Sequence, residues 1–371
     1  MRRLAAAACS LLLLAACSEG GVADGPSTSS ATTETTRTSG APATTDAATT
    51  DPATTDAATT DASTAAVPTT TQPPVPYAAT IDELLAIGRP IVLAHTAGED
   101  AYPASTLFAF GESVKAGVDM LDLNINITAD GELVVQHDDT VDRNTSGTGA
   151  VADLTMAEIA ELDAAYWFAT DCADCHDGAE SSYLYRGIRS GEVQPPAGYT
   201  ADDFALPTLA QLVERFPDIP LNIEIKGEGE IALRTADELA VQLYELGRDQ
   251  ASVVASFQDD VVSYFHSIAP GVEVSPGLNV LTAYVLESVA IPDGMRILQL
   301  PPEFSGLQVI TPELVARATA DGYPIWVWPN DRDLENFDSY LAFLQQGIVG
   351  LNINFPVEGV AAVTEYVSAE E

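Results

Sequence analysis

Histidines, carboxylates and one lysine occur where short apolar segments end, and at such positions side chains can meet along one edge of a sheet. His95 follows an apolar segment that ends at Ala94, and His137 follows one that ends at Gln136. A histidine can give or take a proton near neutral pH, so such a pair suits acid and base roles. Taken alone, each histidine is more often a structural residue in a polar network.

Two polar stripes lie between and after these histidines. Side chains alternate along a strand, so Asp122 and Asn124 share one face of a predicted strand, and Glu224 and Lys226 share one face of another. Two interpretations are open. The stripes could form a buried hydrogen-bonded network, or Asp122, Asn124 and Glu224 could bind a hard cation, Ca²⁺ or Mg²⁺. The second interpretation suits proton-transfer chemistry on a phosphate ester.

The elements that must position these residues read as an α/β pattern. Short β-branched and apolar segments alternate with helical patterns, and Thr208 and Thr311 are expected helix caps. Roughly eight strand–helix units in this length predict a (β/α)8 TIM barrel over residues 79–365, with reactive groups at the carboxyl ends of its strands. No G-x-G-x-x-G follows the first strand, which argues against a dinucleotide-binding fold.

The first part of the chain is not predicted to belong to this barrel. Residues 1–17 read as an export signal ending in Leu-Ala-Ala-Cys, which resembles the bacterial lipobox in which Cys17 is lipidated. A cut signal peptide with a chance cysteine is the alternative. Residues 18–78 are rich in Thr, Ala, Asp and Pro, which predicts a disordered linker. We expect a protein anchored to the outer face of the bacterial cell membrane.

The charge of the chain restricts its partners. The formal net charge is −40 at pH 7, with only 15 lysines and arginines, so the basic surface of a nucleic-acid-binding protein is missing. The acidic surface of this chain repels an anionic substrate unless the site itself is positive. A bound cation and Lys226 would make the site positive. We expect a small phosphodiester substrate and a membrane contact through the lipid anchor. The sequence does not indicate an oligomeric state.

Cys172 and Cys175 are the cysteines left after the signal segment. In an exported protein such a pair most often forms a disulfide. The spacing Cys172-Ala173-Asp174-Cys175-His176 also matches the C-x-x-C-H pattern of covalent haem attachment. Both cysteines lie in a loop-rich insertion at 168–204. A segment of this length without periodicity is either a functional loop or a surface excursion.

A set of short motifs resembles the glycerophosphodiester phosphodiesterase family. The motifs cover about residues 88–360 and are, in chain order, Leu93–His95, Tyr102–Leu107, Gly117–Asn124, Asp130-Gly131, His137-Asp138, Arg143, Thr145–Gly149, Pro207–Leu209, Phe216–Asp218, Asn222–Lys226, Ser256-Phe257 and Gly350–Pro356. Each motif is short, but their order and spacing together are specific. The resemblance implies a TIM barrel that hydrolyses glycerophosphodiesters to glycerol 3-phosphate and an alcohol with a divalent cation.

The resemblance also implies roles for particular residues. These are His95 and His137 as the acid/base pair, Asp122, Asn124 and Glu224 as metal ligands, and Lys226 as the phosphate-contacting lysine. In the family one histidine removes the proton of a neighbouring glycerol hydroxyl while the other protonates the leaving alkoxide.

The chain departs from the family pattern near the expected cation. Thr96 replaces an arginine, Ala104 a glutamate, Asp122 a glutamate, and both Asn124 and Asn354 replace aspartates. Two hypotheses follow. The chain is an active, surface-anchored phosphodiesterase with a weakened or retuned cation site, or it is a non-catalytic relative that binds a phosphodiester or a cell-envelope ligand.

Overall fold

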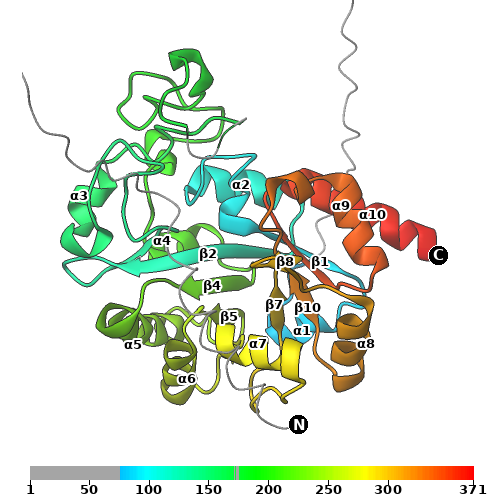
Figure 1. Cartoon of the computed structure of the whole chain (residues 1–371). Helices are drawn as coiled ribbons and strands as arrows, with labels where there is room; N and C mark the ends of the chain where they lie inside the picture. The colour runs from blue at the N-terminus through cyan, green and yellow to red at the C-terminus, as the bar shows by residue number, and fades with distance from the viewer. Residues whose placement is uncertain (1–75, 171, 173–174) are drawn as a thin grey trace, which may run out of the picture. The chain divides into compact units, whose positions relative to one another are not determined.

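Eight parallel strands form the main sheet in the described part of the chain, residues 76–170, 172 and 175–371 of a computed structural model (Figure 1). They are β1 (Ile91–Ala94), β2 (Met120–Ile127), β4 (Leu221–Ile225), β5 (Ser252–Ala255), β6 (Glu273–Val274), β7 (Leu298–Leu300), β10 (Ile325–Val327) and β11 (Gly350–Ile353). Their order is β6-β5-β4-β2-β1-β11-β10-β7. A parallel bridge between Val274 of β6 and Met295 joins one outer strand to the segment that leads into the other, β7. The sheet therefore closes on itself, which confirms the predicted TIM barrel.

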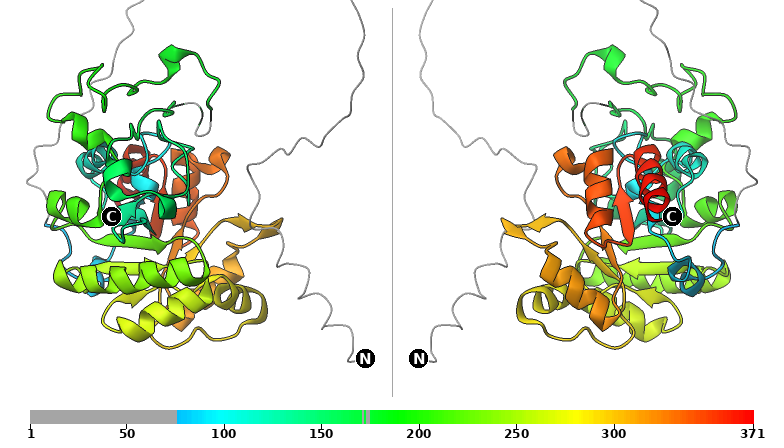
Figure 2. Two further views of the ribbon diagram at one scale, coloured as in Figure 1. Left: turned by 90° about the vertical axis from the view of Figure 1, so that its left-hand side faces the viewer. Right: turned by 90° about the vertical axis from the view of Figure 1, so that its right-hand side faces the viewer.

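Helices cover the outside of this barrel (Figure 2). They are α1 (Ile81–Leu85), α2 (Leu107–Ala116), α3 (Met156–Ala160), α4 (Leu209–Arg215), α5 (Gly229–Glu245), α6 (Asp259–Ile268), α7 (Leu278–Glu287), α8 (Pro312–Asp321), α9 (Phe337–Gln345) and α10 (Pro356–Glu370). The expected caps are confirmed, because Thr208 Oγ1 accepts from Gln211 N and Thr311 Oγ1 accepts from Leu314 N. None of the helices in residues 76–170 and 175–371 combines the length and apolar character needed to cross a membrane.

The amino-terminal end of the barrel is filled by apolar side chains. Residues from strands that are not neighbours pack together there, so they meet inside the barrel: Ile91, Leu93, Met120, Val253, Ile297 and Trp326. Helix α1 adds Ile81 and Leu84 to this cluster. The apolar layer closes one end and leaves the carboxyl ends of the strands as the open face.

A polar layer lies above the apolar one. Gln299 and Asn222 exchange two hydrogen bonds through their amides, and Gln299 Nε2 also donates to Ser275 Oγ. Asn222 Nδ2 donates in turn to Asp122 Oδ1 at 2.5 Å. The network joins β2, β4 and β7 to Ser275 just after β6, so the inward polar residues of these strands satisfy one another.

Some elements differ from the predictions. Helices α1 and α10 were not predicted, since α1 is very short and α10 follows a proline with a mixed pattern of small and charged residues. Outside the eight barrel strands, β3 (Leu133–Val135) matches a predicted strand and pairs antiparallel with β2, and β8 (Glu303–Phe304) and β9 (Leu307–Gln308) form a short hairpin. The predicted signal peptide, Cys17 and nearly all of the linker 18–78 lie outside the described residues.

The loop-rich insertion is packed onto the barrel. Its Ile188, Tyr199 and Phe204 form a cluster with Phe108 of α2, and the Phe108 and Phe204 rings stack at 4.7 Å. Figures 1 and 2 show the green loops of this segment beyond α2 and α3, at one end of the molecule. The insertion is therefore part of the same folded unit as the barrel.

Candidate active site

Both predicted histidines lie at the carboxyl ends of the strands. His95 directly follows β1 and opens a short 3₁₀ turn, His95–Ala97, in which Thr96 and Ala97 have positive φ. His137 follows β3 after one intervening residue. The ring centroids of the two histidines are 6.4 Å apart, with the rings edge to face. Residues that are distant in the sequence thus meet at one mouth of the barrel.

His95 is surrounded by hydrogen-bond acceptors. Asn354 Nδ2 donates to Asp100 Oδ2, so its Oδ1 faces His95 Nδ1 and accepts a hydrogen bond of 2.8 Å. Glu99 Oε1 lies 3.4 Å from the same nitrogen. Burial alone would lower the pKa of His95, but the hydrogen bond and charge of Glu99, with smaller contributions from Asp122 and Asn354, raise this pKa to about 10. His95 is therefore an imidazolium at neutral pH.

His137 has a different environment. Its Nδ1 lies 2.7 Å from Asp138 Oδ1, and its Nε2 lies 3.2 Å from Lys226 Nζ. An ammonium group has only donors, so Nε2 accepts from Lys226 and Nδ1–H donates to Asp138. This pairing assigns the neutral tautomer to His137. The two histidines thus hold opposite proton states, one ready to give a proton and the other ready to accept one.

Asp138 is itself held in place by Arg143. Arg143 Nε donates to Asp138 Oδ2 at 2.7 Å, and Arg143 Nη1 lies 3.6 Å from Glu99 Oε2. Burial would raise the pKa of Asp138, but hydrogen bonds from His137 and Arg143 hold it well below its usual range. Arg143 thus links the carboxylate beside His137 to the carboxylate beside His95.

Glu224 lies in β4 and Lys226 directly follows the strand, two residues further along the chain. Lys226 Nζ donates to Glu224 Oε2 at 3.0 Å. The register places Glu224 opposite Asn124 of β2, and Asp122 opposite Asn222. The structure therefore brings Asn124, Glu224 and Lys226 together at the mouth with the two histidines.

The predicted cation ligands form hydrogen bonds or an ion pair with other protein groups. Asp122 accepts from Asn222 Nδ2 through one oxygen and from Thr96 N through the other, at 2.5 and 3.2 Å. Asn124 Nδ2 donates to Thr96 Oγ1, and Glu224 shares its charge with Lys226. Ca²⁺ and Mg²⁺ require six or more oxygen ligands, usually with several carboxylates, though waters can complete the set. In the described residues no group of three or more His, Cys, Asp or Glu could hold a metal ion. The residues present do not fit a divalent cation.

Three charged residues of the mouth were given no role by sequence reasoning. Asp138 and Arg143 were recognised only as parts of family motifs, and Glu99 was not singled out. The available signal for Glu99 was its place four residues after His95, within the turn that follows the strand. Glu99 and Ala104 line the same cavity of about 20 Å³, room for about one water. Glu99 thus supplies a carboxylate near the position where Ala104 replaces one.

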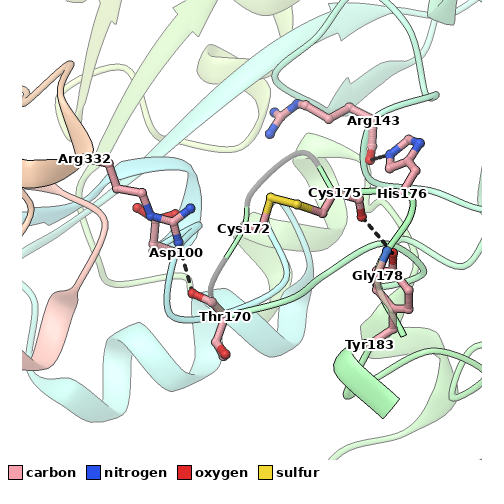
Figure 3. The surroundings of a disulfide bond; sticks show 9 residues. All are labelled: Asp100, Arg143, Thr170, Cys172, Cys175, His176, Gly178, Tyr183 and Arg332. Carbon is pink, nitrogen blue, oxygen red and sulfur yellow. Dashed lines mark hydrogen bonds and ion pairs between the residues drawn. A yellow bond between two sulfur atoms is a disulfide. The ribbon is translucent and has the colours of Figure 1, made fainter. Parts of the chain in front are cut away.

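The insertion contacts the mouth on two sides, as Figure 3 shows around the Cys172–Cys175 bond. Arg332 Nη2, from the loop after β10, donates to Thr170 O at 3.0 Å and pairs with Asp100 at 2.9 Å. On the other side, the His176 ring stacks on Trp167 at 4.1 Å, and its Nε2 donates to Arg143 O at 2.8 Å. The insertion thus supports the backbone of Arg143.

We expect His176→Phe to weaken substrate binding. Phenylalanine keeps a flat ring for stacking on Trp167 but loses the hydrogen bond to the carbonyl of Arg143. A net hydrogen bond is worth about 1 kcal/mol, which corresponds to about a fivefold rise in KM with kcat within about twofold. Steady-state kinetics on a phosphodiester would measure this. His266→Phe, on α6, is the matched control, and equal KM values for both variants would show that His176 does not support the mouth.

Comparison with known proteins matches this chain to one family. The family model described as "Glycerophosphoryl diester phosphodiesterase family" matches residues 95–358. A glycerophosphodiester phosphodiesterase from Caldanaerobacter subterraneus subsp. tengcongensis is 28% identical over 250 residues, covering 65% of this chain and 86% of that protein. A probable glycerophosphodiester phosphodiesterase 1 from Mycobacterium tuberculosis is 40% identical over 86 residues, covering 23% of this chain and 31% of that protein.

A solved structure shares the barrel. A phosphodiesterase from Oleispira antarctica, in complex with the product sn-glycerol-3-phosphate, matches with a TM-score of 0.56 and 18% identity. The match covers 74% of this chain and 97% of that chain. At this identity the likeness supports the fold.

Proposed function

Because this chain belongs to the glycerophosphoryl diester phosphodiesterase family, we propose that its barrel mouth hydrolyses glycerophosphodiesters to glycerol 3-phosphate and an alcohol. The observation that carries the proposal is the histidine pair with opposite proton states. The rings lie 6.4 Å apart, with Lys226 beside one of them. This arrangement favours an enzyme over the alternative of a non-catalytic binding protein.

The first step forms a cyclic phosphate. The neighbouring hydroxyl of the glycerol moiety takes the place of Lys226 as the hydrogen-bond donor to His137 Nε2, and it attacks phosphorus while Nε2 takes its proton. The bond from phosphorus to the alcohol oxygen breaks, and His95 gives its Nε2 proton to the leaving alkoxide, since its Nδ1 is engaged with Asn354 and Glu99. Asp138 stabilises the imidazolium that forms at His137. A positioned acid and base each contribute about 10²–10⁴-fold.

The second step opens the ring with water. His95, now neutral, takes a proton from the attacking water. His137 returns its proton to the glycerol oxygen as the ring bond breaks, and both histidines regain their starting states. Lys226 offsets the charge of the phosphoryl oxygens in both steps.

The family is generally dependent on a divalent metal ion, which would neutralise the phosphoryl oxygens and lower the pKa of the attacking group. The sequence predicted Ca²⁺ or Mg²⁺ at Asp122, Asn124 and Glu224. Because those residues do not fit such an ion in this structure, no step above passes through a metal.

The assay for this proposal is the release of glycerol 3-phosphate from glycerophosphocholine and related diesters, with and without added Ca²⁺, Mg²⁺ or Mn²⁺. Wild-type protein is expected to release it, and His95→Ala is expected to lose this activity. Equal release by both proteins would contradict the role of His95, and no release from any diester would contradict the activity itself.

The pH dependence tests the acid role of His95. Its pKa of about 10 keeps the proton in place through neutral pH, so kcat/KM should fall only as the pH approaches 10. The same raised pKa adds to the free energy of unfolding. This contribution is complete below pH 6.5 and is lost as the pH rises through about 10.

Glu99→Gln removes the carboxylate that raises this pKa. We expect the alkaline limb of the pH–rate profile to move toward neutral pH by about one unit or more. The exposed Glu228→Gln is the matched control and should leave the profile in place. An unchanged limb in Glu99→Gln would mean that another group sets it.

We also propose that the protein is exported and anchored to the outer face of the bacterial membrane through Cys17, with Cys172 and Cys175 oxidised there. The lipobox-like segment supports the anchor, and the oxidising compartment outside the cytoplasm supports the disulfide. Cys17→Ala is expected to move the protein from the membrane fraction to the soluble fraction or the medium. Unchanged fractionation would contradict the anchor.

A further inference from the structure

We propose that this mouth binds and hydrolyses its phosphodiester without a divalent cation, with Lys226 facing the phosphate and a hydrogen-bonded side-chain network in place of a metal site. This inference rests on the proposed function of the same site. It follows from the donor set of β2 and β4, from the network around Thr96, and from the charge of the substrate.

The three predicted cation ligands carry little negative charge that a cation could neutralise. Of the three positions predicted to hold a cation, Asn124 is neutral and Glu224 is paired with Lys226 at 3.0 Å. Asp122 is the only one of the three that keeps a negative charge outside an ion pair, and it is 5% exposed and hydrogen-bonded to Asn222. A hard cation bound here would gain little charge compensation and would lie close to the ammonium of Lys226.

Thr96 ties the same residues together. Its N–H donates to Asp122 Oδ2, and its hydroxyl oxygen accepts from Asn124 Nδ2. Thr96 adopts a left-handed conformation, φ 47°, that is costly for a β-branched residue. These two hydrogen bonds help to hold it there, so Thr96, Asp122 and Asn124 act as one structural unit.

This unit continues into the barrel. Asp122 accepts from Asn222, Asn222 pairs with Gln299, and Gln299 reaches Ser275. The oxygens of Asp122, Asn222 and Gln299 accept from side-chain amides and, for Asp122, from the backbone N–H of Thr96, so they are satisfied without a cation. The three residues that depart from the family pattern, Thr96, Asp122 and Asn124, therefore belong to one hydrogen-bonded network.

The charge of the substrate can be balanced by Lys226. A phosphodiester is a monoanion, so one nearby ammonium can balance it. Lys226 Nζ has three N–H donors, and its hydrogen bonds to Glu224 and His137 use two. The third is available to a phosphoryl oxygen at the point where His137 would accept the hydroxyl proton.

The experiment compares metal-free and metal-supplied protein in two measurements. Protein dialysed against EDTA and passed over a chelating resin is assayed for hydrolysis of glycerophosphocholine and titrated with sn-glycerol 3-phosphate in a calorimeter. We expect kcat/KM and affinity to change by less than about twofold when Mg²⁺, Ca²⁺ or Mn²⁺ is added. A loss of about tenfold or more on chelation, restored by any of these ions, would overturn the inference.

A direct cation titration separates this inference from the proposed function. Wild-type protein is expected to bind no Mn²⁺ or Ca²⁺ at millimolar concentration, whereas Asp122→Glu with Asn124→Asp is expected to gain binding. Asn330→Asp, exposed in the loop after β10, is the control for added charge. If no diester is hydrolysed under any condition, the proposed function fails. Stoichiometric cation binding by the wild-type protein would overturn the metal-free site, whether or not a diester is hydrolysed.

Discussion

His137→Gln is expected to lower kcat for glycerophosphodiester hydrolysis by about 10²–10⁴-fold. The reason is that Nε2 of His137 is the atom that takes the hydroxyl proton, and glutamine keeps a polar side chain of similar reach without a basic nitrogen. Lys226 still faces the phosphate, so KM should change by less than about threefold, as expected for a loss confined to the transition state. Steady-state kinetics of glycerol 3-phosphate release provide both constants.

The control for this substitution is His266→Gln on α6, which should keep wild-type kinetics. A rescue experiment adds free imidazole, which can enter the space left by a truncated side chain in His137→Gly and restore part of the rate. If His137→Gln retains kcat within a few-fold of wild type, another group is the base.

Lys226→Met is expected to reduce kcat/KM by about 10²–10³-fold. Methionine preserves the length and the apolar contacts of the lysine stem but removes the charge that faces the phosphoryl oxygens. The substitution also removes the N–H group that donates to His137 Nε2 at 3.2 Å. Both kcat and KM should therefore worsen, and calorimetric titration with sn-glycerol 3-phosphate should show the lost affinity directly.

Lys226→Arg is expected to recover part of this loss, because it restores the charge with a different shape. Lys115→Met is the matched control, since Lys115 lies on α2 in a surface pair with Glu112. If Lys226→Met binds the product as tightly as wild type, Lys226 does not contact the phosphate.

The barrel and the main site positions could be predicted because they depend on local rules. Alternation along β4 places Glu224 and Lys226 on one face, and the end of β1 fixes the position of His95. The motif order then identified the histidines as a pair, and the structure places them 6.4 Å apart.

The electrostatic partners could not be predicted, because they come from loops and from strands distant in the sequence. The position of Glu99 beside His95 depends on the positive φ of Thr96 and Ala97, which neither residue type favours. The engagement of Asp122 depends on Asn222 and Gln299, which reach it only when the barrel closes. Sequence spacing therefore indicated which side chains share a face, but not which partners they bond to.

The most direct test of catalysis is phosphorus NMR of glycerophosphocholine incubated with wild-type protein and with His137→Gln. The predicted result is that wild type replaces the diester signal with the phosphomonoester signal of glycerol 3-phosphate, through a cyclic phosphate that accumulates transiently or not at all, while the variant leaves the diester intact. A diester signal that wild-type protein broadens by binding but never converts, with or without added divalent cations, would contradict the enzyme and identify a phosphodiester-binding protein.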